Sequence, residues 1–353
     1  MMIDVRGIAA AEPYGILRRL SGKAWIPVKG FEAHLIEELA YHNKGSSLQP
    51  FNNLLYCEDF PSEVFWKQLC WERPFIVRFG SIGEAADVLR GIQRNWAHYP
   101  VACFRRAELI SAKLPHISKK EKNFPYTVPL TDMGVWSLLD EHTLLASAQT
   151  SSPFPLGVIR FIEDHENPPS RAYLKVWEAL CLLNFYYRRK AETCGLSPEM
   201  IPADWALPQR GSRCIDAGAC PGGWTWALLN TGADVLAIDR SPIADSLMQS
   251  PQIAFMQHDA FTVSPRELGT QDWIFSDVIC YPPRLFEWVE RWLASGLCDK
   301  FVCTIKMQGC PDFETVSRFA RIPHSKIVHL TANKHELTWL RAPFIPESWK
   351  GKQ

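Results

Sequence analysis

A glycine-rich turn between a strand-like and a helix-like run constrains the fold of this chain most. Residues 214–224 read Cys-Ile-Asp-Ala-Gly-Ala-Cys-Pro-Gly-Gly-Trp, an apolar run with an acidic residue, then the turn, and residues 225–229 continue as a helix-like run. This order is typical of folds that hold a nucleoside-bearing cofactor at a helix N-terminus. Cys220 replaces the glycine that would let the backbone approach a pyrophosphate. The turn therefore favours a cofactor with a nucleoside and no phosphates, such as S-adenosylmethionine.

Strand-like and helix-like runs alternate from residue 211 onward, which is typical of a doubly wound, Rossmann-like α/β sheet. Five strands are expected at 213–217, 234–238, 253–257, 273–276 and 300–305. Helices are expected at 224–229, 286–293 and 313–320, and a closing strand pair at 326–330 and 336–340. A further apolar-periodic helix over 171–188 precedes this sheet, with Ser170 as its expected N-cap.

The first 150 or so residues are less regular and predict a smaller α+β domain. An amphipathic helix is expected at 31–41, with strands at 74–79 and 144–148. The segment 150–157 is rich in turn-forming residues and is the expected border between domains. We therefore expect an N-terminal domain over 1–155 and a Rossmann-like domain that holds the cofactor over 156–353.

Composition narrows the function classes. Lys+Arg and Asp+Glu both number 38, so no overall basic field indicates a nucleic-acid partner, which would have to be held by local patches. The eleven cysteines form no Cys-x-x-Cys pair, which disfavours a zinc site or a disulfide framework and favours free thiols in the cytoplasm. The histidines show no metal spacing. No signal peptide or membrane-spanning stretch is apparent, so a cytoplasmic location is expected.

Acidic residues recur at the carboxyl ends of the expected strands, where ligands bind in sheets of this kind. Asp239 ends the second strand and is placed to take both ribose hydroxyls, Asp259 follows the third, within reach of an adenine amino group, and Asp277 follows the fourth. Each alone would most often be a turn or cap residue. Three aspartates at equivalent positions after three strands favour a cofactor pocket. The expected cofactor-binding residues are Ser170, Asp216, Gly218, Cys220, Pro221, Gly222, Gly223, Trp224, Asp239, Asp259 and Asp277.

The glycine turn, Ile-Asp-Arg-Ser-Pro at 238–242, Ser-Asp-Val at 276–278, Ile-Lys at 305–306 and Glu-Leu-Thr at 336–338 together resemble the FtsJ-type RNA ribose 2′-O-methyltransferases. The chain looks closest to the bacterial members that methylate a cytidine ribose of 23S ribosomal RNA. Segments 30–32, 152–157 and 169–175 are similar to theirs. In those enzymes the N-terminal half is a THUMP-containing RNA-binding region, which the resemblance implies here.

The resemblance also implies a catalytic Lys-Asp-Lys-Glu set, at Lys175, Asp277, Lys306 and Glu336. A ribose hydroxyl is a poor nucleophile, so a base must take its proton as the methyl group leaves the sulfonium. Lys306 is the expected base, which must be neutral to act, and Lys175 would supply positive charge nearby. Asp277 and Glu336 would orient the lysines and the hydroxyl.

Structural readings of the same residues remain open. Lys175 could be a solvated helix lysine paired with Glu178, and Glu336 a charge at the end of a hairpin. Cys220 is expected to be a small packing residue and not a nucleophile. Trp224 is expected to be a core residue and not one that stacks on a base.

RNA contacts are expected in two basic stretches, although a solvated surface is the alternative for both. One comprises Arg105, Arg106, Lys113, Lys119, Lys120 and Lys122, and the other comprises Arg188, Arg189 and Lys190. If RNA binds there, neutralising Lys119, Lys120 and Lys122 should weaken binding and flatten its salt dependence.

The sequence thus predicts an S-adenosylmethionine-dependent 2′-O-methyltransferase acting on RNA, with 23S ribosomal RNA as the expected partner and no metal. Two alternatives stay open: methylation of a protein or small molecule on the same fold, and a non-catalytic cofactor- and RNA-binding factor in ribosome assembly. The oligomeric state cannot be read from the sequence.

Overall fold

The computed structural model describes residues 16–42, 48–58, 63–195 and 207–343. The chain divides into two compact units: the first comprises Met1–Glu121 and Pro129–Arg160, and the second comprises Lys122–Val128 and Phe161–Gln353. None of the described helices combines the length and the apolar character needed to cross a membrane.

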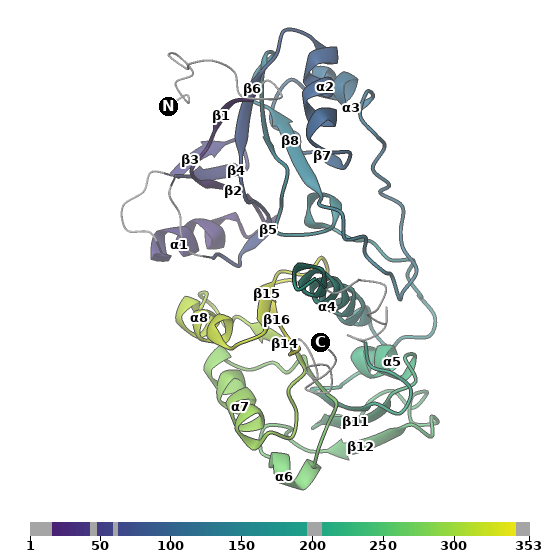
Figure 1. Ribbon diagram of the computed structural model, residues 1–353. Helices are drawn as coiled ribbons and strands as arrows, with labels where there is room; N and C mark the ends of the chain where they lie inside the picture. The colour runs from purple at the N-terminus through teal and green to yellow at the C-terminus, as the bar shows by residue number, and fades with distance from the viewer. Residues whose placement is uncertain (1–15, 43–47, 59–62, 196–206, 344–353) are drawn as a thin grey trace. The chain divides into compact units, whose positions relative to one another are not determined.

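The first unit contains two antiparallel-rich sheets and three helices (Figure 1). Its five-stranded sheet has the order β1-β6-β9-β8-β7, with bounds Ile16–Arg19, Phe75–Arg78, Thr143–Ser147, Gly134–Leu138 and Trp96–His98. Its four-stranded sheet has the order β3-β4-β2-β5, with bounds Leu48–Phe51, Leu54–Cys57, Lys23–Pro27 and Lys67–Trp71. The helices are α1 (Glu32–His42), α2 (Ile82–Ile92) and α3 (Phe104–Ser111), and a short 3₁₀ helix η2 spans Pro155–Gly157.

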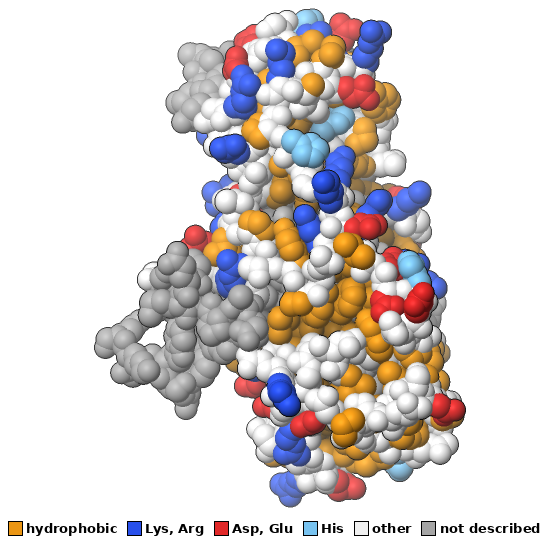
Figure 2. Space-filling view, turned by 90° about the vertical axis from the view of Figure 1, so that its right-hand side faces the viewer, with side chains coloured by type: hydrophobic (Ala, Val, Ile, Leu, Met, Phe, Trp, Pro, Cys, Tyr) orange, Lys and Arg blue, Asp and Glu red, His pale blue; other side chains and the backbone are white. Residues whose placement is uncertain are grey.

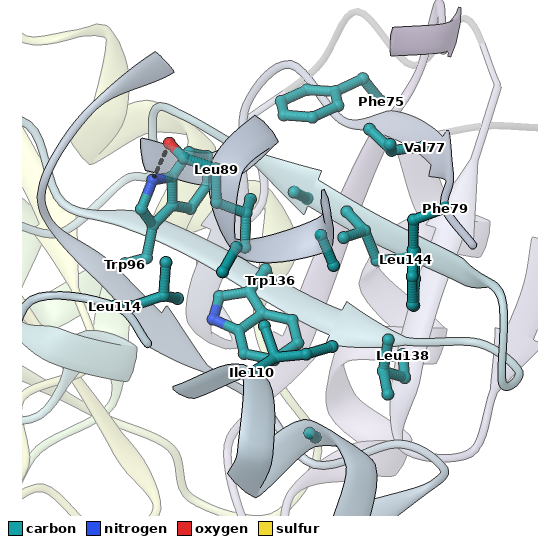
Figure 3. Close-up of a cluster of buried hydrophobic side chains, with 14 residues drawn as sticks. Phe75, Val77, Phe79, Leu89, Trp96, Ile110, Leu114, Trp136, Leu138 and Leu144 are labelled. Carbon is teal, nitrogen blue, oxygen red and sulfur yellow. Dashed lines mark hydrogen bonds between the residues drawn. The ribbon is translucent and has the colours of Figure 1, made fainter. Parts of the chain in front are cut away.

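Both faces of the five-stranded sheet are buried, as the alternation along its strands requires. Phe75 and Val77 of β6 pack beneath α2 and α3 in one hydrophobic cluster (Figure 3), while Ile76 between them belongs to a second cluster shared with the four-stranded sheet. Trp96 of β7 lies in the first cluster and donates its indole N–H to the carbonyl of Leu89 at 2.8 Å. The sheet is therefore the central layer of this unit.

The second unit is built on a seven-stranded sheet of order β12-β11-β10-β13-β14-β16-β15. The strands span Ile253–Gln257, Asp234–Asp239, Arg213–Ala217, Trp273–Ser276, Phe301–Lys306, Glu336–Arg341 and Ser325–Val328 in that order. The first five are parallel, and β16 runs antiparallel to both β14 and β15. The expected α/β sheet and its closing strand pair are confirmed.

Helices cover both faces of this sheet (Figure 1). On one face lie α4 (Tyr173–Thr193) and α5 (Gly223–Leu229), and on the other lie α7 (Pro282–Ser295) and α8 (Phe313–Arg321), with the short α6 (Pro265–Leu268) beside α7. The large apolar residues of the parallel strands, such as Ile215, Phe275 and Val302, are fully buried between these layers. Such continuous apolar strands are what a sheet covered on both sides requires.

One local expectation is wrong. The helix expected from residue 171 begins at Tyr173, and its N-cap is Ala172 instead of Ser170. The Ser170 hydroxyl accepts a long hydrogen bond from the Ala172 N–H, at 3.4 Å, but it lies outside the helix. The reason is the packing of the neighbouring glycine turn, because the space next to Ser170 is occupied by the backbone of Gly223.

Candidate active site

The topology brings four charged side chains to one edge of the seven-stranded sheet. Asp277 directly follows β13 and Lys306 ends β14, and these neighbouring parallel strands have their carboxyl ends at the same edge. Because β16 is antiparallel to β14, its first residue, Glu336, is the register partner of Lys306. Lys175, in the first turn of α4, reaches the same place from the helix that covers the sheet.

The four side chains form a closed cluster of ion pairs. Lys175 Nζ lies 3.2 Å from both Asp277 oxygens and 2.6 Å from Glu336 Oε1. Lys306 Nζ lies 3.1 Å from Asp277 Oδ1 and 3.9 Å from Glu336 Oε2. Two cations therefore face two carboxylates, and the formal charge of the cluster is zero. The solvated alternative for Lys175 is wrong, since this residue is only 7% exposed. Glu336 does begin the second strand of the β15–β16 pair, but this residue is also only 7% exposed.

The two lysines occupy different environments. Burial lowers the pKa of Lys175, but the charges of Asp277 and Glu336 outweigh that effect, so the net pKa is raised. A lysine with a raised pKa keeps its charge at neutral pH, and the stabilisation it provides is lost only as the pH rises through that folded-state pKa. Lys306 makes fewer and longer contacts, and its side chain is 17% exposed against 9% for Lys175. Lys306 is therefore the lysine that a substrate can reach.

The buried carboxyl of Glu178 holds a loop next to the cluster. Glu178, one turn after Lys175 on α4, accepts hydrogen bonds from the backbone N–H of Thr331 at 2.8 Å and from its hydroxyl at 3.2 Å. These bonds anchor the loop that leads into Glu336. Burial raises the pKa of Glu178 to about 8, so the group holds its proton at neutral pH. The suggested pairing of Lys175 with Glu178 is replaced by these contacts.

A cleft of about 260 Å³ opens beside the cluster, at the carboxyl ends of the parallel strands. Six of the residues singled out from the sequence line it, namely Gly218, Cys220, Asp239, Asp259, Asp277 and Lys306. Gly218 has φ +80°, and a Cβ there would lie 2.9 Å from the Val278 backbone, so the turn can approach the β13 end only with glycine at this position. The cleft thus joins the glycine turn to the lysine cluster.

Two aspartates in the cleft are held in fixed orientations. Asp239 accepts hydrogen bonds from the backbone N–H groups of Cys220 at 3.0 Å and Ser241 at 2.8 Å, one on each oxygen. Each carboxylate oxygen keeps a further lone pair for a ligand. Asp259 accepts from the Phe261 N–H at 3.0 Å and pairs with Arg284 at 2.9 Å. Burial would raise the pKa of Asp259, but these two donors together lower it.

Other expected cofactor-binding residues lie outside the cleft lining. Asp216 is completely buried and accepts from the Thr225 hydroxyl at 2.6 Å, and burial raises its pKa to about 7. Asp216 is not among the residues that line the cleft, and its expected role in cofactor binding stays a prediction. Trp224 is 3% exposed and packs edge-on against Phe275, as a core residue.

The remaining residues of the turn shape its backbone. Pro221, Gly222 and Gly223 are not among the residues that line the cleft, and neither is Ser170. Gly222 has φ +115° and is the N-cap of α5, and Gly223 opens that helix in close contact with Ser170. These residues set the course of the chain behind the cleft.

The sequence reasoning missed three polar residues of the cleft: Arg240, His258 and Arg284. Arg240 and His258 each stand next to a predicted aspartate, so their positions after strands were a usable signal. Arg284 lies 25 residues from its partner Asp259, and no local pattern indicates the pairing. Within the described residues, no group of His, Cys, Asp and Glu side chains is arranged to hold a metal ion.

The first unit has a separate cleft of about 510 Å³ that includes part of the first basic stretch. Lys119 and Lys120 line it, together with His98, His116 and Trp96. Burial and the charge of Lys119 lower the pKa of His98 to about 4, so its ring is neutral at pH 7. This cleft offers cationic and aromatic groups side by side.

The second basic stretch is engaged by the protein itself. Arg188 donates to the carbonyl of Val128 at 2.8 Å, and Arg189 lies 3.4 Å from Glu192. Lys122, from the first stretch, lies over the ring of Tyr126 at 5.2 Å. Side chains that already have partners are weaker candidates for phosphate contacts than Lys119 and Lys120.

Comparison with known proteins identifies the domain that carries the active-site cleft. Residues 199–307 match the FtsJ-like methyltransferase family. Ribosomal RNA large subunit methyltransferase M of Azotobacter vinelandii is 34% identical over 163 residues, which cover 46% of this chain and 41% of that protein. The protein of the same name from Xanthomonas euvesicatoria pv. vesicatoria is 28% identical over 238 residues, 65% of this chain and 60% of that protein.

The match therefore spans roughly half the length of these relatives. It confirms the expected resemblance to FtsJ-type methyltransferases and, with it, S-adenosylmethionine as the cofactor of this domain.

Proposed function

We propose that this chain, which carries an FtsJ-like methyltransferase domain, transfers a methyl group from S-adenosylmethionine to a ribose 2′-hydroxyl of RNA. The acceptor we propose is a cytidine of 23S ribosomal RNA, in line with the name of the relatives. The observation that carries the proposal is the cluster of two lysines and two carboxylates at the end of the cofactor cleft.

The residues of the cleft fit the proposed cofactor. Asp239 presents two oriented carboxylate oxygens at the end of β11, where they can accept from the two ribose hydroxyls of a nucleoside. Gly218 and Cys220 line the cleft beside Asp239, which accepts from the Cys220 N–H, and Asp259 also lines it, suited to an amino group of adenine. When bound, S-adenosylmethionine supplies an electrophilic methyl group on a positively charged sulfur.

We propose that Lys306 is the general base. Its position between Asp277 and the cleft lets its Nζ accept the proton of the 2′-hydroxyl as the oxygen forms its bond to the methyl carbon and the carbon–sulfur electron pair returns to sulfur. Lys175 binds both carboxylates more closely than Lys306 does, and its fixed charge lies next to the base.

Asp277 and Glu336 are proposed as orienting groups. Both contact Lys175 and Lys306, so they hold the two ammonium groups close to each other. In-line transfer depends on the alignment of oxygen, methyl carbon and sulfur, which well-ordered neighbours provide. Glu178 contributes through the loop ahead of Glu336 and is a positioning residue.

We propose that the first unit, a THUMP-like domain in this account, recruits the RNA. Figure 2 shows lysine and arginine side chains scattered over one face of the molecule among acidic ones, with no continuous basic surface. The cleft of this unit presents the charges of Lys119 and Lys120 next to the exposed ring of His116, which suits contacts to phosphates and to a base. The reaction would take place in the cytoplasm, the location that we propose for this protein.

The test is the chemical identity of the product. The full chain is incubated with tritiated S-adenosylmethionine and unmodified 23S RNA made by transcription, and the RNA is then hydrolysed in alkali. A 2′-O-methyl group prevents cleavage of the following phosphodiester, so the label should appear in alkali-resistant dinucleotides. Label in mononucleotides would mean base methylation and would refute the ribose assignment. Label in protein or small molecules alone, or none at all, would favour one of the two alternative functions.

A further inference from the structure

The two most exposed large hydrophobic side chains of the described residues lie together beside the catalytic cluster. Ile279 is 74% exposed and Tyr281 is 66% exposed, and both follow Asp277 within four residues. Single exposed hydrophobic residues are common on protein surfaces and need no explanation. Ile279 lines a polar cleft and Tyr281 follows it by two residues. Together they keep apolar area in water at a free-energy cost, and this indicates that a ligand covers them.

The segment that carries them alternates between buried and exposed side chains. Val278 lies against Gly218, and Cys280 is 8% exposed. Burial raises the pKa of the Cys280 thiol to about 11, and the nearby charges of Arg284 and Lys306 reduce that rise. The Cys280 side chain is therefore buried, with Arg284 and Lys306 near it. Ile279 and Tyr281, on the opposite side of the extended segment, point out of the protein.

The backbone of this segment is held rigidly. Tyr281 precedes Pro282, which restricts Tyr281 to extended conformations, and its φ of −67° and ψ of 143° agree with that restriction. Pro282 is buried at the start of α7. A side chain on such a fixed backbone loses little conformational freedom when a ligand covers it, so the contact retains most of its binding free energy.

We propose that Ile279 and Tyr281 form the platform that receives the base of the acceptor nucleotide. Ile279 lines the same cleft as Lys306 and Asp277, and Arg284, which follows Tyr281 by three residues, lines it too. The 2′-hydroxyl is one carbon away from the carbon that bears the base. A ribose whose hydroxyl reaches Lys306 therefore places its base next to the rim of this cleft.

The occupant is an unstacked nucleobase of single-stranded RNA. Enzymes that act on RNA recognise splayed-out bases by stacking them on aromatic side chains, and one such stack contributes about 1–3 kcal/mol. The phenol ring supplies the stacking face, and the isoleucine supplies apolar contact to the sugar edge. This inference rests on the proposed function and adds the residues that would bind the substrate nucleotide.

Kinetics on the full chain test the platform. Tyr281→Ala should lower kcat/KM for unmodified 23S RNA by about 5- to 150-fold, which is the rate equivalent of losing one stacked base. Tyr281→Phe keeps the ring and should retain near wild-type kcat/KM, and Ile279→Ala should show a smaller loss. Affinity for S-adenosylmethionine, measured by calorimetry, should not change. Ile162→Ala is the matched control, because Ile162 is 51% exposed in the same unit but away from the cleft lining.

The outcomes separate cleanly. Methylation by wild type with an unchanged kcat/KM for Tyr281→Ala would overturn the platform and leave the proposed function standing. A parallel loss of cofactor affinity would overturn it as well, since the residue would then serve the cofactor. If wild type methylates no RNA, both proposals fall.

Cross-linking gives a second, activity-independent readout. Long-wave irradiation of the chain with a 5-iodocytidine-substituted transcript should attach RNA to the peptide that contains Tyr281, and Tyr281→Ala should abolish that adduct. An adduct pattern without this peptide would contradict the assignment. Tyr281-dependent capture of a protein in place of RNA would also overturn it and would mark the patch as a protein interface.

Discussion

Removing Lys175 tests the electrostatic core of the site, because this residue forms ion pairs with both carboxylates. Its Nζ lies 2.6 Å from Glu336 and 3.2 Å from Asp277, and the exposed fractions of these three side chains are 9% to 16%. Breaking a pair this well buried leaves an uncompensated charge and costs about 3–5 kcal/mol. Lys175→Met should therefore lower the free energy of unfolding by that amount.

The same argument predicts recovery in a second variant. Glu336→Gln in the Lys175→Met background removes the orphaned carboxylate and leaves the Lys306–Asp277 pair, so the double variant should regain at least about 2 kcal/mol. Urea denaturation of the four proteins, followed by circular dichroism, gives the double-mutant cycle. Lys326→Met, at an exposed strand position, is the control and should change stability by less than about 0.5 kcal/mol.

The pH dependence sharpens this prediction. Since the folded-state pKa of Lys175 is raised, its contribution should be constant from about pH 6 to about pH 9 and be lost only above its unfolded pKa. A cost for Lys175→Met below about 1 kcal/mol, or single-variant costs that simply add in the double variant, would refute the reasoning.

Three further predictions follow from the structure. Replacing Lys119 and Lys120 by Gln should weaken RNA binding and reduce the slope of log affinity against log salt concentration by about 0.7–0.9 for each lost phosphate contact. An unchanged slope in filter-binding assays would show that this cleft does not contact RNA. The raised pKa of Glu178 makes the folded state hold a proton that the unfolded state releases, so wild type should lose stability as the pH rises from about 4.5 towards about 8, by at most about 1.4 kcal/mol per pH unit. Glu178→Gln should reduce this loss. Equal thermal-melting profiles for both proteins across this pH range would count against the prediction. Gly223→Ala should destabilise the protein by about 1–3 kcal/mol and weaken cofactor binding, since its Cβ would overlap a serine side chain; Gly83→Ala, where only ordinary contact distances arise, should be tolerated, and equal melting temperatures for the two variants would contradict the overlap.

The second unit was predictable because its sheet obeys rules that are local in sequence. Apolar runs followed by acidic residues gave the strands and their carboxyl ends, and β13 and β14 lie where that pattern predicts. The antiparallel pair β15 and β16 was also predicted, and its register places Glu336 opposite Lys306. The identity of the four residues that meet at this edge was implied by the resemblance to FtsJ-type methyltransferases.

Other features depend on contacts that no local pattern encodes. The sequence could not show that Lys175 would be the more buried lysine, because its environment comes from three distant segments. The pairing of Arg284 with Asp259 and the complete burial of Asp216 are of the same kind. Ser170 has the chemistry of an N-cap, but packing against Gly223 moved the helix start beyond it.

In the first unit the sequence predicted single elements but not their arrangement. Helix α1 and strands β6 and β9 lie where the pattern indicated. The order β1-β6-β9-β8-β7 joins strands that are far apart along the chain, and such pairings are fixed by packing of both sheet faces. The THUMP-like character and the RNA-binding role of this unit stay predictions.

The most direct test of the central claim is methyl transfer by Lys306→Ala under single-turnover conditions. We expect that S-adenosylmethionine affinity is retained while the transfer rate to 23S RNA falls by about 10²- to 10⁴-fold, the usual contribution of a general base. Transfer at the wild-type rate, with cofactor bound equally well, would show that another group takes the proton and would contradict the proposed mechanism.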